Sequence, residues 1–223
     1  MDAIIDFIKM LFGWLKDPRP LVEMAGIPGM ALVIFLETGA MVFLLPGDSM
    51  LFVAGLFAAE GTLNIFTLNA VLIPCAILGD ATSYFIGARS GGKLFAKPES
   101  RFFKPAHLQK AADFYEKHGG KAIIIARFMP IVRTFVPVVA GMAKMPYRRF
   151  ATYNIIGAAS WILSMSLLGY FMGNVIPNID KHIEKVIIGV VFVSITPGLW
   201  EWWKARRAGK QAEKAEAVAP KAL

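Results

Sequence analysis

The sequence predicts an all-α polytopic membrane protein, an inverted repeat with two opposed re-entrant helical hairpins, about three spanning helices and an N-terminal amphipathic helix. Apolar residues make up 56% of its 223 residues and charged residues only 18%. Soluble domains have about 45–50% apolar and about 25% charged residues. The apolar excess is spread along the chain, where only lipid could cover it. This length leaves no room for a separate soluble catalytic domain.

The composition also excludes disulfide scaffolds and cysteine metal clusters, because the chain has a single cysteine, Cys75. The net charge of +8 comes mainly from three basic clusters beside apolar runs. Such clusters are typical of cytoplasmic loops that touch anionic phospholipids. A nucleic-acid partner is not expected, since no basic run alternates with stacking aromatics. The clusters are residues 89–121, the turn with Lys144, Arg148 and Arg149, and the segment with Lys204, Arg206, Arg207 and Lys210.

Residues 1–20 predict an amphipathic helix that lies in the membrane interface. Apolar and charged side chains separate onto two faces at helical spacing. A cleaved signal peptide is the alternative, but two acids precede the first lysine and no small-residue cleavage site follows an apolar core. The apolar face holds Ile4, Ile5, Ile8, Leu11, Phe12 and Leu15, and the other face holds Asp2, Asp6, Lys9 and Lys16.

Three segments predict helices that cross the bilayer: residues 63–88, 150–173 and 183–203. Each reaches the ~20 residues needed for a ~30 Å hydrocarbon core. The last ends in Trp200, Trp202 and Trp203 before basic residues, an aromatic anchor that predicts a cytoplasmic carboxyl end. Residues 204–223 predict a disordered basic cytoplasmic tail. Residues 21–203 are therefore expected to form a single membrane domain.

Two other apolar stretches, residues 28–59 and 122–143, predict re-entrant hairpins. The first contains Glu37 and the turn sequence Pro46, Gly47 and Asp48. Splitting the second into equal arms gives about 11 residues each, or ~16 Å, half a bilayer. Broken backbone at this depth must be buried in protein or line a wet cavity. The residues expected to shape the hairpins are Pro46, Gly47, Pro130, Pro137 and Gly141.

The basic clusters predict that the hairpins enter from opposite faces. If the carboxyl end is cytoplasmic, counting the spans back from it places all three basic clusters in the cytoplasm. The two hairpins then enter the membrane from opposite faces, which implies an inverted repeat. A short internal echo supports this, since Pro46, Ala54 and Gly55 parallel Pro137, Ala140 and Gly141. The side of the amino terminus stays open, because residues 28–44 are long enough nearly to span the bilayer.

Four ionisable side chains within the hairpins predict a common site: Glu37, Asp48, Arg127 and Arg133. Each would cost ~2.5–3.5 kcal/mol if isolated at the bilayer centre. Together they would cost about 10 kcal/mol, comparable with a domain's stability. We therefore expect them to meet around a polar cavity. The alternative is that they are plain ion pairs that hold the hairpins together.

This group of residues predicts a site for an anionic headgroup. Arginine presents a planar fork that fits phosphate oxygens, and helix amino ends favour the same anion. Burial favours the neutral form of a carboxyl group, so Glu37, Asp48 and Asp80 are candidates for proton coupling. For Asp80 a basic loop residue as partner is the alternative. Asn154 and Trp161 are expected in packing, with lining of the cavity as the alternative.

Several weaker signals do not predict function. Gly87, Gly92 and Lys93 fit a phosphate-loop pattern, but Leu94 stands where Ser or Thr is needed. Three scattered histidines predict no metal site, and no nucleophile–base set indicates an enzyme. We expect no cofactor. Gly169 and Gly173 indicate ordinary helix packing.

Three blocks of the sequence resemble the DedA family, relatives of the SNARE-associated Golgi (VTT-domain) proteins. They are FLETGAMVFLLPGDSMLFVAG (35–55), LGDATSYFIG (78–87) and ARFMPIVRTFVPVVAG (126–141). The resemblance covers roughly residues 20–175. It implies an inner-membrane transporter-like protein with two opposed re-entrant hairpins that is linked to envelope maintenance. Members are implicated in translocating lipid carriers such as undecaprenyl phosphate, and eukaryotic relatives in lipid scrambling.

The resemblance also implies that the acids at Glu37 and Asp48 and the arginines at Arg127 and Arg133 are essential. We therefore expect a flippase that moves an anionic lipid, best fitted by a polyprenyl phosphate, with proton coupling. The alternatives are a proton-coupled exporter of small cations or drugs and a membrane-embedded enzyme acting on lipid phosphates. The sequence leaves open the exact lipid, the direction of transport, whether coupling is obligatory, and the oligomeric state, a homo-oligomer included.

Overall fold

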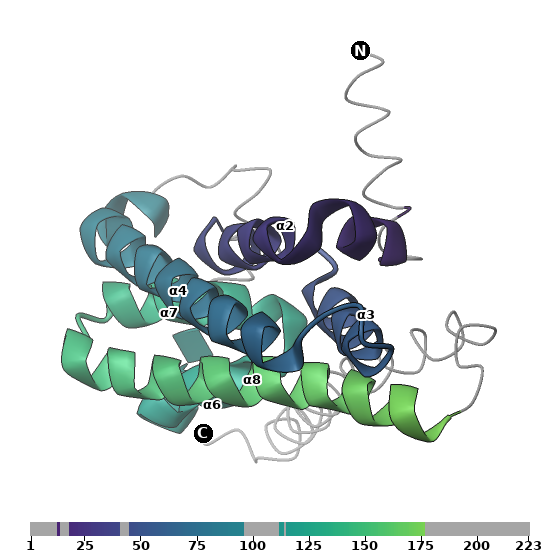
Figure 1. The fold of residues 1–223 in the computed structure, drawn as a ribbon. Helices are drawn as coiled ribbons and strands as arrows, with labels where there is room; N and C mark the ends of the chain where they lie inside the picture. Colours follow the sequence, from purple (N-terminus) through teal and green to yellow (C-terminus); the bar gives the residue numbers. More distant parts are fainter. Residues whose placement is uncertain (1–12, 14–17, 41–44, 96–111, 114, 177–223) are drawn as a thin grey trace, which may run out of the picture.

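The computed structural model describes residues 13, 18–40, 45–95, 112–113 and 115–176, and all regular structure in them is helical (Figure 1). The predicted span 183–203 and tail 204–223 lie outside these residues. So does the predicted interfacial helix 1–20, apart from Gly13 and residues 18–20.

The first helix, α2 (Arg19–Gly39), begins earlier than the hairpin arm expected from residue 28. Pro18 precedes the helix, and a second proline lies in its first turn. Proline suits this position because the first N–H groups of a helix have no partner within the helix. The chain leaves helical geometry at Gly26, with φ 54°, a value that glycine adopts without strain. Because Pro28 lacks an N–H, this break lets a second helical run start beside it and continue to Gly39.

Two further helices complete the first half of the chain. The short helix α3 (Gly47–Ala59) is buried along nearly its whole length. A turn then leads to α4 (Ile65–Phe95), whose first backbone N–H groups, those of Phe66 and Thr67, donate to Oδ1 of Asn64 at 3.0 Å. This side-chain cap starts α4 at the residue after Asn64.

The second half of the chain repeats the plan of a broken helix followed by a long one. A 3₁₀ turn, η1 (Gly119–Lys121), leads into α6 (Ala122–Ala126), and after a break come α7 (Pro130–Met142) and α8 (Tyr147–Val175). Met129 is extended, with φ −123° and ψ 102°, because a residue before proline avoids helical geometry. Pro137 lies inside α7, which continues through it.

The helix breaks expected within residues 28–59 and 122–143 are thus present, but the arms of the second are unequal. Its first arm, α6, has 5 residues and its second, α7, has 13, where equal arms of about 11 were expected. The reason is that Pro130 sets the break close to the start of the stretch. Insertion of the two broken helices from opposite faces of a membrane stays a prediction.

Among the residues that the structure describes, three helices are long and apolar enough to cross a membrane: Arg19–Gly39, residues Ile65–Ser90 of α4, and Tyr147–Val175. The last two coincide with the predicted spans 63–88 and 150–173. The first was expected to be a shorter hairpin arm, and it reaches this length because α2 includes the residues before Pro28. Large apolar side chains are exposed on these helices, among them Met24, Phe66 and Phe171, as expected where lipid replaces water.

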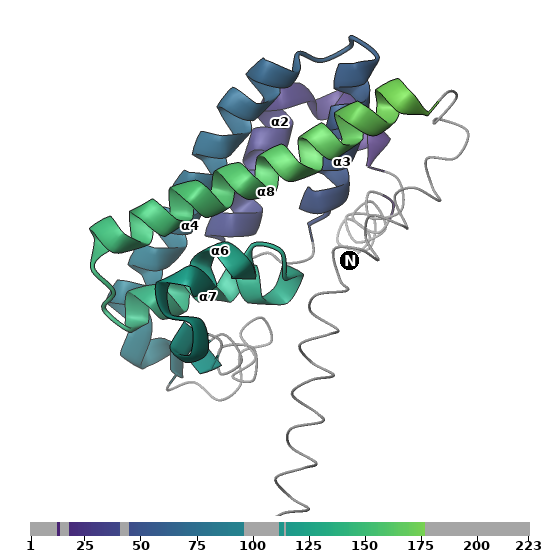
Figure 2. The same cartoon turned by 90° about the horizontal axis from the view of Figure 1, so that it is seen from below.

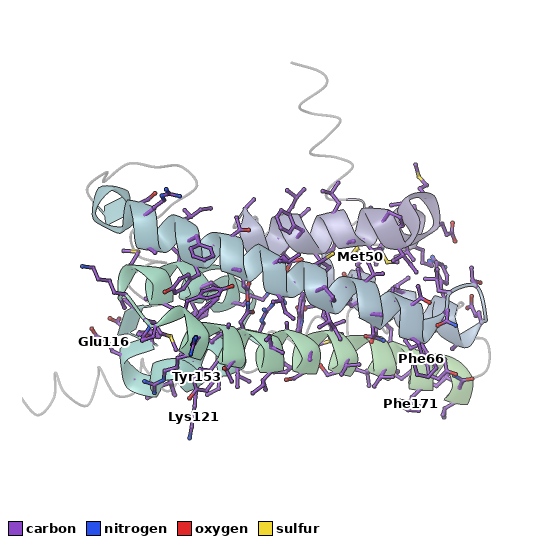
Figure 3. All side chains as sticks on the ribbon, turned by 60° about the vertical axis from the view of Figure 1, so that its left-hand side comes forward. Met50, Phe66, Glu116, Lys121, Tyr153 and Phe171 are labelled. Carbon is purple, nitrogen blue, oxygen red and sulfur yellow. The ribbon has the colours of Figure 1, made fainter. Side chains whose placement is uncertain are left out.

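The two ends of the long helix pair differ in character. The end of α4 and the start of α8 lie together at one end of the fold (Figures 1 and 2). Glu116, Lys121 and Tyr153 lie at this end, whereas Phe66 and Phe171 lie at the other (Figure 3). The exposed Arg148 and Arg149 in the first turn of α8 add charge to the same end. The described parts of two predicted basic clusters therefore share one end of the fold.

Glycines let the two halves of the chain pack against each other. The second arm of each broken helix packs on the long helix of the other half, α3 on α8 and α7 on α4. A Cβ on Gly169 of α8 would lie 3.2 Å from Cα of Gly55 in α3, and a Cβ on Gly141 of α7 would lie 2.8 Å from the backbone nitrogen of Ala88 in α4. These close approaches are typical of helix interfaces in membranes.

We predict that Gly169→Ala destabilises the fold. The added methyl group would overlap the Phe52 carbonyl oxygen, and such overpacking costs roughly 1–3 kcal/mol. Thermal unfolding of the purified protein in detergent measures this. The control is Leu168→Ala, which truncates the adjacent, exposed side chain. Equal stability of the Gly169→Ala protein and the wild type would contradict the close packing.

Candidate functional site

Five buried or nearly buried ionisable side chains, one from each of five elements, meet inside the fold. Glu37 lies near the end of α2, Asp48 in the first turn of α3 and Asp80 within α4. Arg127 follows the last residue of α6, and Arg133 lies in the first turn of α7. Since both broken helices contribute, the site depends on the pairing of the two halves of the chain.

Arg133 joins the second broken helix to both arms of the first. Its Nη2 donates to Oε1 of Glu37, and its Nη1 donates to Oδ1 of Asp48 at 2.6 Å. The side chain of Glu37 is fully buried, whereas that of Asp48 is 13% exposed. The guanidinium fork therefore binds two carboxylates at once, and Asp48 is the member of this group that lies nearest the surface.

Arg127 makes a separate group with Asp80 and Asn154. Its Nη2 donates to Oδ2 of Asp80 and to Oδ1 of Asn154 at 2.7 Å. The Asn154 amide in turn donates to the Ile77 carbonyl oxygen at 3.0 Å. Asp80 is thus paired with an arginine of the predicted site. The predicted set of two acids and two arginines divides into two groups of contacts.

Trp161 of α8 touches both groups. Its indole Nε1–H donates to Oδ1 of Asp48 at 2.7 Å. The Cζ atoms of Arg133 and Arg127 lie 4.7 and 5.8 Å from its ring centroid, within the range of a cation–π contact. The sequence predicted a packing role for Trp161 and Asn154, and the structure gives both a polar contact with the ionisable residues.

A signal for these two residues was present in the sequence. Asn154, Gly157 and Trp161 follow one another at steps of three and four, so they line one face of α8. A Cβ on Gly157 would lie 3.3 Å from Cγ of Arg127, which shows that this face lies against the arginine. A buried tryptophan also needs an acceptor for its N–H.

The end of α2 is held in place by Ser83 and by glycines, of which the sequence analysis singled out only Gly47. Ser83 Oγ donates to the carbonyl oxygens of Thr38 and Gly39 at 2.6 and 3.1 Å, satisfying groups that a helix end leaves open. A Cβ on Gly39 would lie 3.2 Å from Cα of Gly79. A Cβ on Gly47 would overlap the carboxyl group of Glu37. Together these contacts fix the position of the Glu37 carboxyl group.

The site has one more carboxyl group than guanidinium group, and the excess lies with Arg133. That group holds Glu37 and Asp48 against one arginine, while Arg127 and Asp80 balance each other. Three buried polar atoms also have no hydrogen-bond partner among the described residues: Glu37 Oε2, Arg127 Nε and Arg133 Nε. Leaving such atoms unpaired costs about 1–3 kcal/mol each, so they mark where a polar ligand group would be stabilised.

Within the described part of the chain, no group of three or more His, Cys, Asp or Glu side chains could hold a metal ion. Each of the three carboxyl groups is instead paired with an arginine. The donors that remain available are guanidinium N–H groups, which favour oxyanions.

Comparison with known proteins identifies the family. The family model described as the VTT domain matches residues 45–171. The chain is 49% identical over 186 residues to Protein DedA of Escherichia coli K12, covering 82% of this chain and 84% of that protein. It is 41% identical over 203 residues to an uncharacterized membrane protein of Mycobacterium leprae, covering 91% of each. It is 31% identical over 202 residues to the inner membrane protein YghB of Escherichia coli K12, covering 88% of this chain and 90% of that protein.

No solved structure matches the chain. The VTT-domain match nevertheless spans more than half of it, and both the relatives and the three long apolar helices indicate a multi-pass membrane protein. This chain belongs to the DedA family of membrane proteins.

Proposed function

We propose that the protein is a flippase that moves an anionic lipid between leaflets of the bacterial inner membrane. The proposed substrate is a polyprenyl phosphate such as undecaprenyl phosphate, and transport is coupled to protons. The single observation that carries the proposal is the buried guanidinium group of Arg133 held by two carboxyl groups from opposite sides of a helix break. Such charges deep in a membrane protein usually mark a transport path.

The geometry at Arg133 supports a phosphate ligand. Its two Nη atoms each donate to a different carboxyl oxygen, and a phosphate group offers several oxygens to the same fork. In the empty protein, Glu37 and Asp48 would occupy these donors. The unpartnered Nε atoms of Arg127 and Arg133 offer further donors, so both arginines would contribute to binding.

The charge balance supports coupling to protons. The Arg133 group already carries an excess of one carboxylate when all members are ionised. A further anion at about 4 Å would be opposed by about 4 kcal/mol per charge at an effective dielectric constant of about 20. Proton uptake by Glu37 or Asp48 would remove this repulsion. Asp48 is the more exposed of the two, so protons would reach the site from its side.

The packing supports two opposed hairpins in an inverted repeat. Each half of the chain has a broken helix and a long helix, and each second arm packs on the long helix of the other half, at Gly55 with Gly169 and at Gly141 with α4. Inverted repeats of this kind place the substrate site near the bilayer midplane. The basic end shared by α4 and α8 would face the cytoplasm, and the carboxyl end would lie on the same side.

The excess carboxyl group also favours a second candidate, a proton-coupled exporter of small cations or drugs. In that case the acids would form the substrate site, and Arg133 would only hold their carboxyl groups in position. A membrane-embedded enzyme acting on lipid phosphates is the remaining alternative. It would release a product, which a phosphate-release assay on the purified protein would detect.

We predict that the protein accelerates leaflet exchange of labelled undecaprenyl phosphate after reconstitution into liposomes, and that the rate changes with pH. The phosphate is the recognised group, so the uncharged polyprenol should not be exchanged faster. Empty vesicles and vesicles with the Arg133→Gln protein are the controls. Exchange no faster than in empty vesicles, at every pH tested, would exclude the proposed function.

We predict that Arg133→Lys and Asp48→Asn both abolish or strongly reduce lipid exchange. Lysine keeps the charge but loses the fork, and the loss of a charged hydrogen bond of about 1.5–3 kcal/mol lowers binding roughly 10- to 100-fold. Arg149→Lys, at an exposed arginine, is the matched control. A mild effect of Arg133→Lys beside complete loss in Asp48→Asn would instead favour the cation exporter.

We predict that Asp80→Asn and Arg127→Gln each destabilise the fold by roughly 3–5 kcal/mol, because each leaves a buried charge without its partner. The double variant should be destabilised by less than the sum of the two, with a coupling of about 0.5–3 kcal/mol. Thermal unfolding in detergent measures the stability, and the liposome assay measures transport. A stable double variant that transports at the wild-type rate would show that Arg127 does not bind the lipid.

A further inference from the structure

We propose that Trp161 is a positioning residue. Its indole N–H would keep Asp48 hydrogen-bonded when a phosphate group replaces Asp48 on Arg133. This inference rests on the proposed function, because it assigns a step in how the same site would bind an anion. It concerns a residue that carries no charge itself. The argument depends on which atoms share one oxygen of Asp48.

Trp161 is fully buried, with an exposed fraction of 0%. A buried indole N–H needs an acceptor, and the acceptor is Oδ1 of Asp48 at 2.7 Å. A neutral donor on a carboxylate inside a protein is a strong hydrogen bond, because one partner is charged. Trp161 therefore holds Asp48 independently of any arginine.

The same oxygen of Asp48 also accepts from Nη1 of Arg133, at 2.6 Å. Oδ1 thus has two donors, one charged and one neutral. If a phosphate oxygen took Nη1 of Arg133, Asp48 would lose the charged donor and keep the neutral one. A largely buried carboxylate that loses a donor is disfavoured, so the remaining indole N–H lowers the cost of releasing Asp48 from Arg133.

Glu37 has no comparable second side-chain donor. Its Oε1 accepts from Nη2 of Arg133, and its Oε2 has no hydrogen-bond partner among the described residues. The two acids on Arg133 therefore differ after displacement: Asp48 keeps a side-chain donor, the indole N–H, whereas Glu37 has the backbone of Gly47 beside it. This difference makes Glu37 a matched control for any effect of Trp161 on Asp48.

The ring of Trp161 adds a second contact, separable from the N–H. The Cζ atoms of Arg133 and Arg127 lie 4.7 and 5.8 Å from the ring centroid, so the π face supports both guanidinium groups. Trp161→Phe keeps an aromatic face and removes the donor. Trp161→Leu removes both, which allows the two contributions to be measured apart.

The first test asks whether the indole N–H is bound to Asp48. Trp14, Trp200, Trp202 and Trp203 are replaced by Phe, so that Trp161 is the only indole of the chain. The protein, labelled with ¹⁵N-tryptophan in lipid nanodiscs, then gives one indole N–H resonance. We expect Asp48→Asn to shift this resonance and Glu37→Gln to leave it near its original position. An indole N–H chemical shift that is unchanged by Asp48→Asn would overturn the proposal.

The second test asks whether Trp161 helps an anion to displace Asp48. Binding of labelled undecaprenyl phosphate to the otherwise unmodified protein in nanodiscs is compared for Trp161→Phe, Asp48→Asn and the double variant. We expect Trp161→Phe to weaken binding roughly 10-fold or more, as for one hydrogen bond to a charged group. In the Asp48→Asn background the same substitution should have little effect, because no carboxylate remains to be displaced.

A packing control separates this role from a loss of stability. Phe150→Leu also truncates a fully buried aromatic side chain of α8, and we expect it to lower stability without changing the affinity for the lipid. Equal weakening by Trp161→Phe with and without Asp48 would overturn the positioning role. Failure of the wild type to bind undecaprenyl phosphate would instead exclude the proposed function, and the indole resonance would then decide whether Trp161 holds Asp48.

Discussion

The ion pairs of Arg133 with Glu37 and Asp48 are the constraint on which the rest of the structure depends. A guanidinium group buried in a membrane protein is stable only if anions and hydrogen-bond acceptors surround it. These acceptors come from the end of α2 and the start of α3, so the helix must break between them. Arg133 itself lies just after the second break. The two breaks are therefore needed to bring opposite charges together, and each half of the chain is incomplete alone.

Glycine contacts bring the two halves close together around apolar clusters to which both halves contribute. Association of helices in lipid depends on close packing more than on the hydrophobic effect. Gly55 with Gly169, and Gly141 with the backbone of α4, bring helices from the two halves close enough for short side chains to meet. Gly47 gives the carboxyl group of Glu37 its space. Small residues thus determine where the charged residues can lie.

The charges of the site are arranged unevenly between its two arginines. Arg127 and Asp80 balance each other and are tied to α8 through Asn154, whereas Arg133 is held by an excess of carboxyl groups. Asp48 lies nearest the surface and shares one oxygen between Arg133 and Trp161. A group with two alternative donors can change partner with less loss of hydrogen bonding than a group with one. In the proposed function, the Arg133 group is accordingly the part of the site that would exchange a ligand.

The sequence by itself determined the membrane class, the presence of helix breaks within residues 28–59 and 122–143, and the need of Glu37, Asp48, Arg127 and Arg133 for polar partners. These follow from local rules, since hydropathy, proline geometry and the cost of a buried charge need no knowledge of neighbours. The earlier start of α2 depended on a positive φ at Gly26, and the pairing of Asp80 with Arg127 and the contacts of Trp161 depended on helix packing. Only the tertiary structure decided these, because which charge meets which is set by how closely the helices approach at their glycines and not by any local pattern.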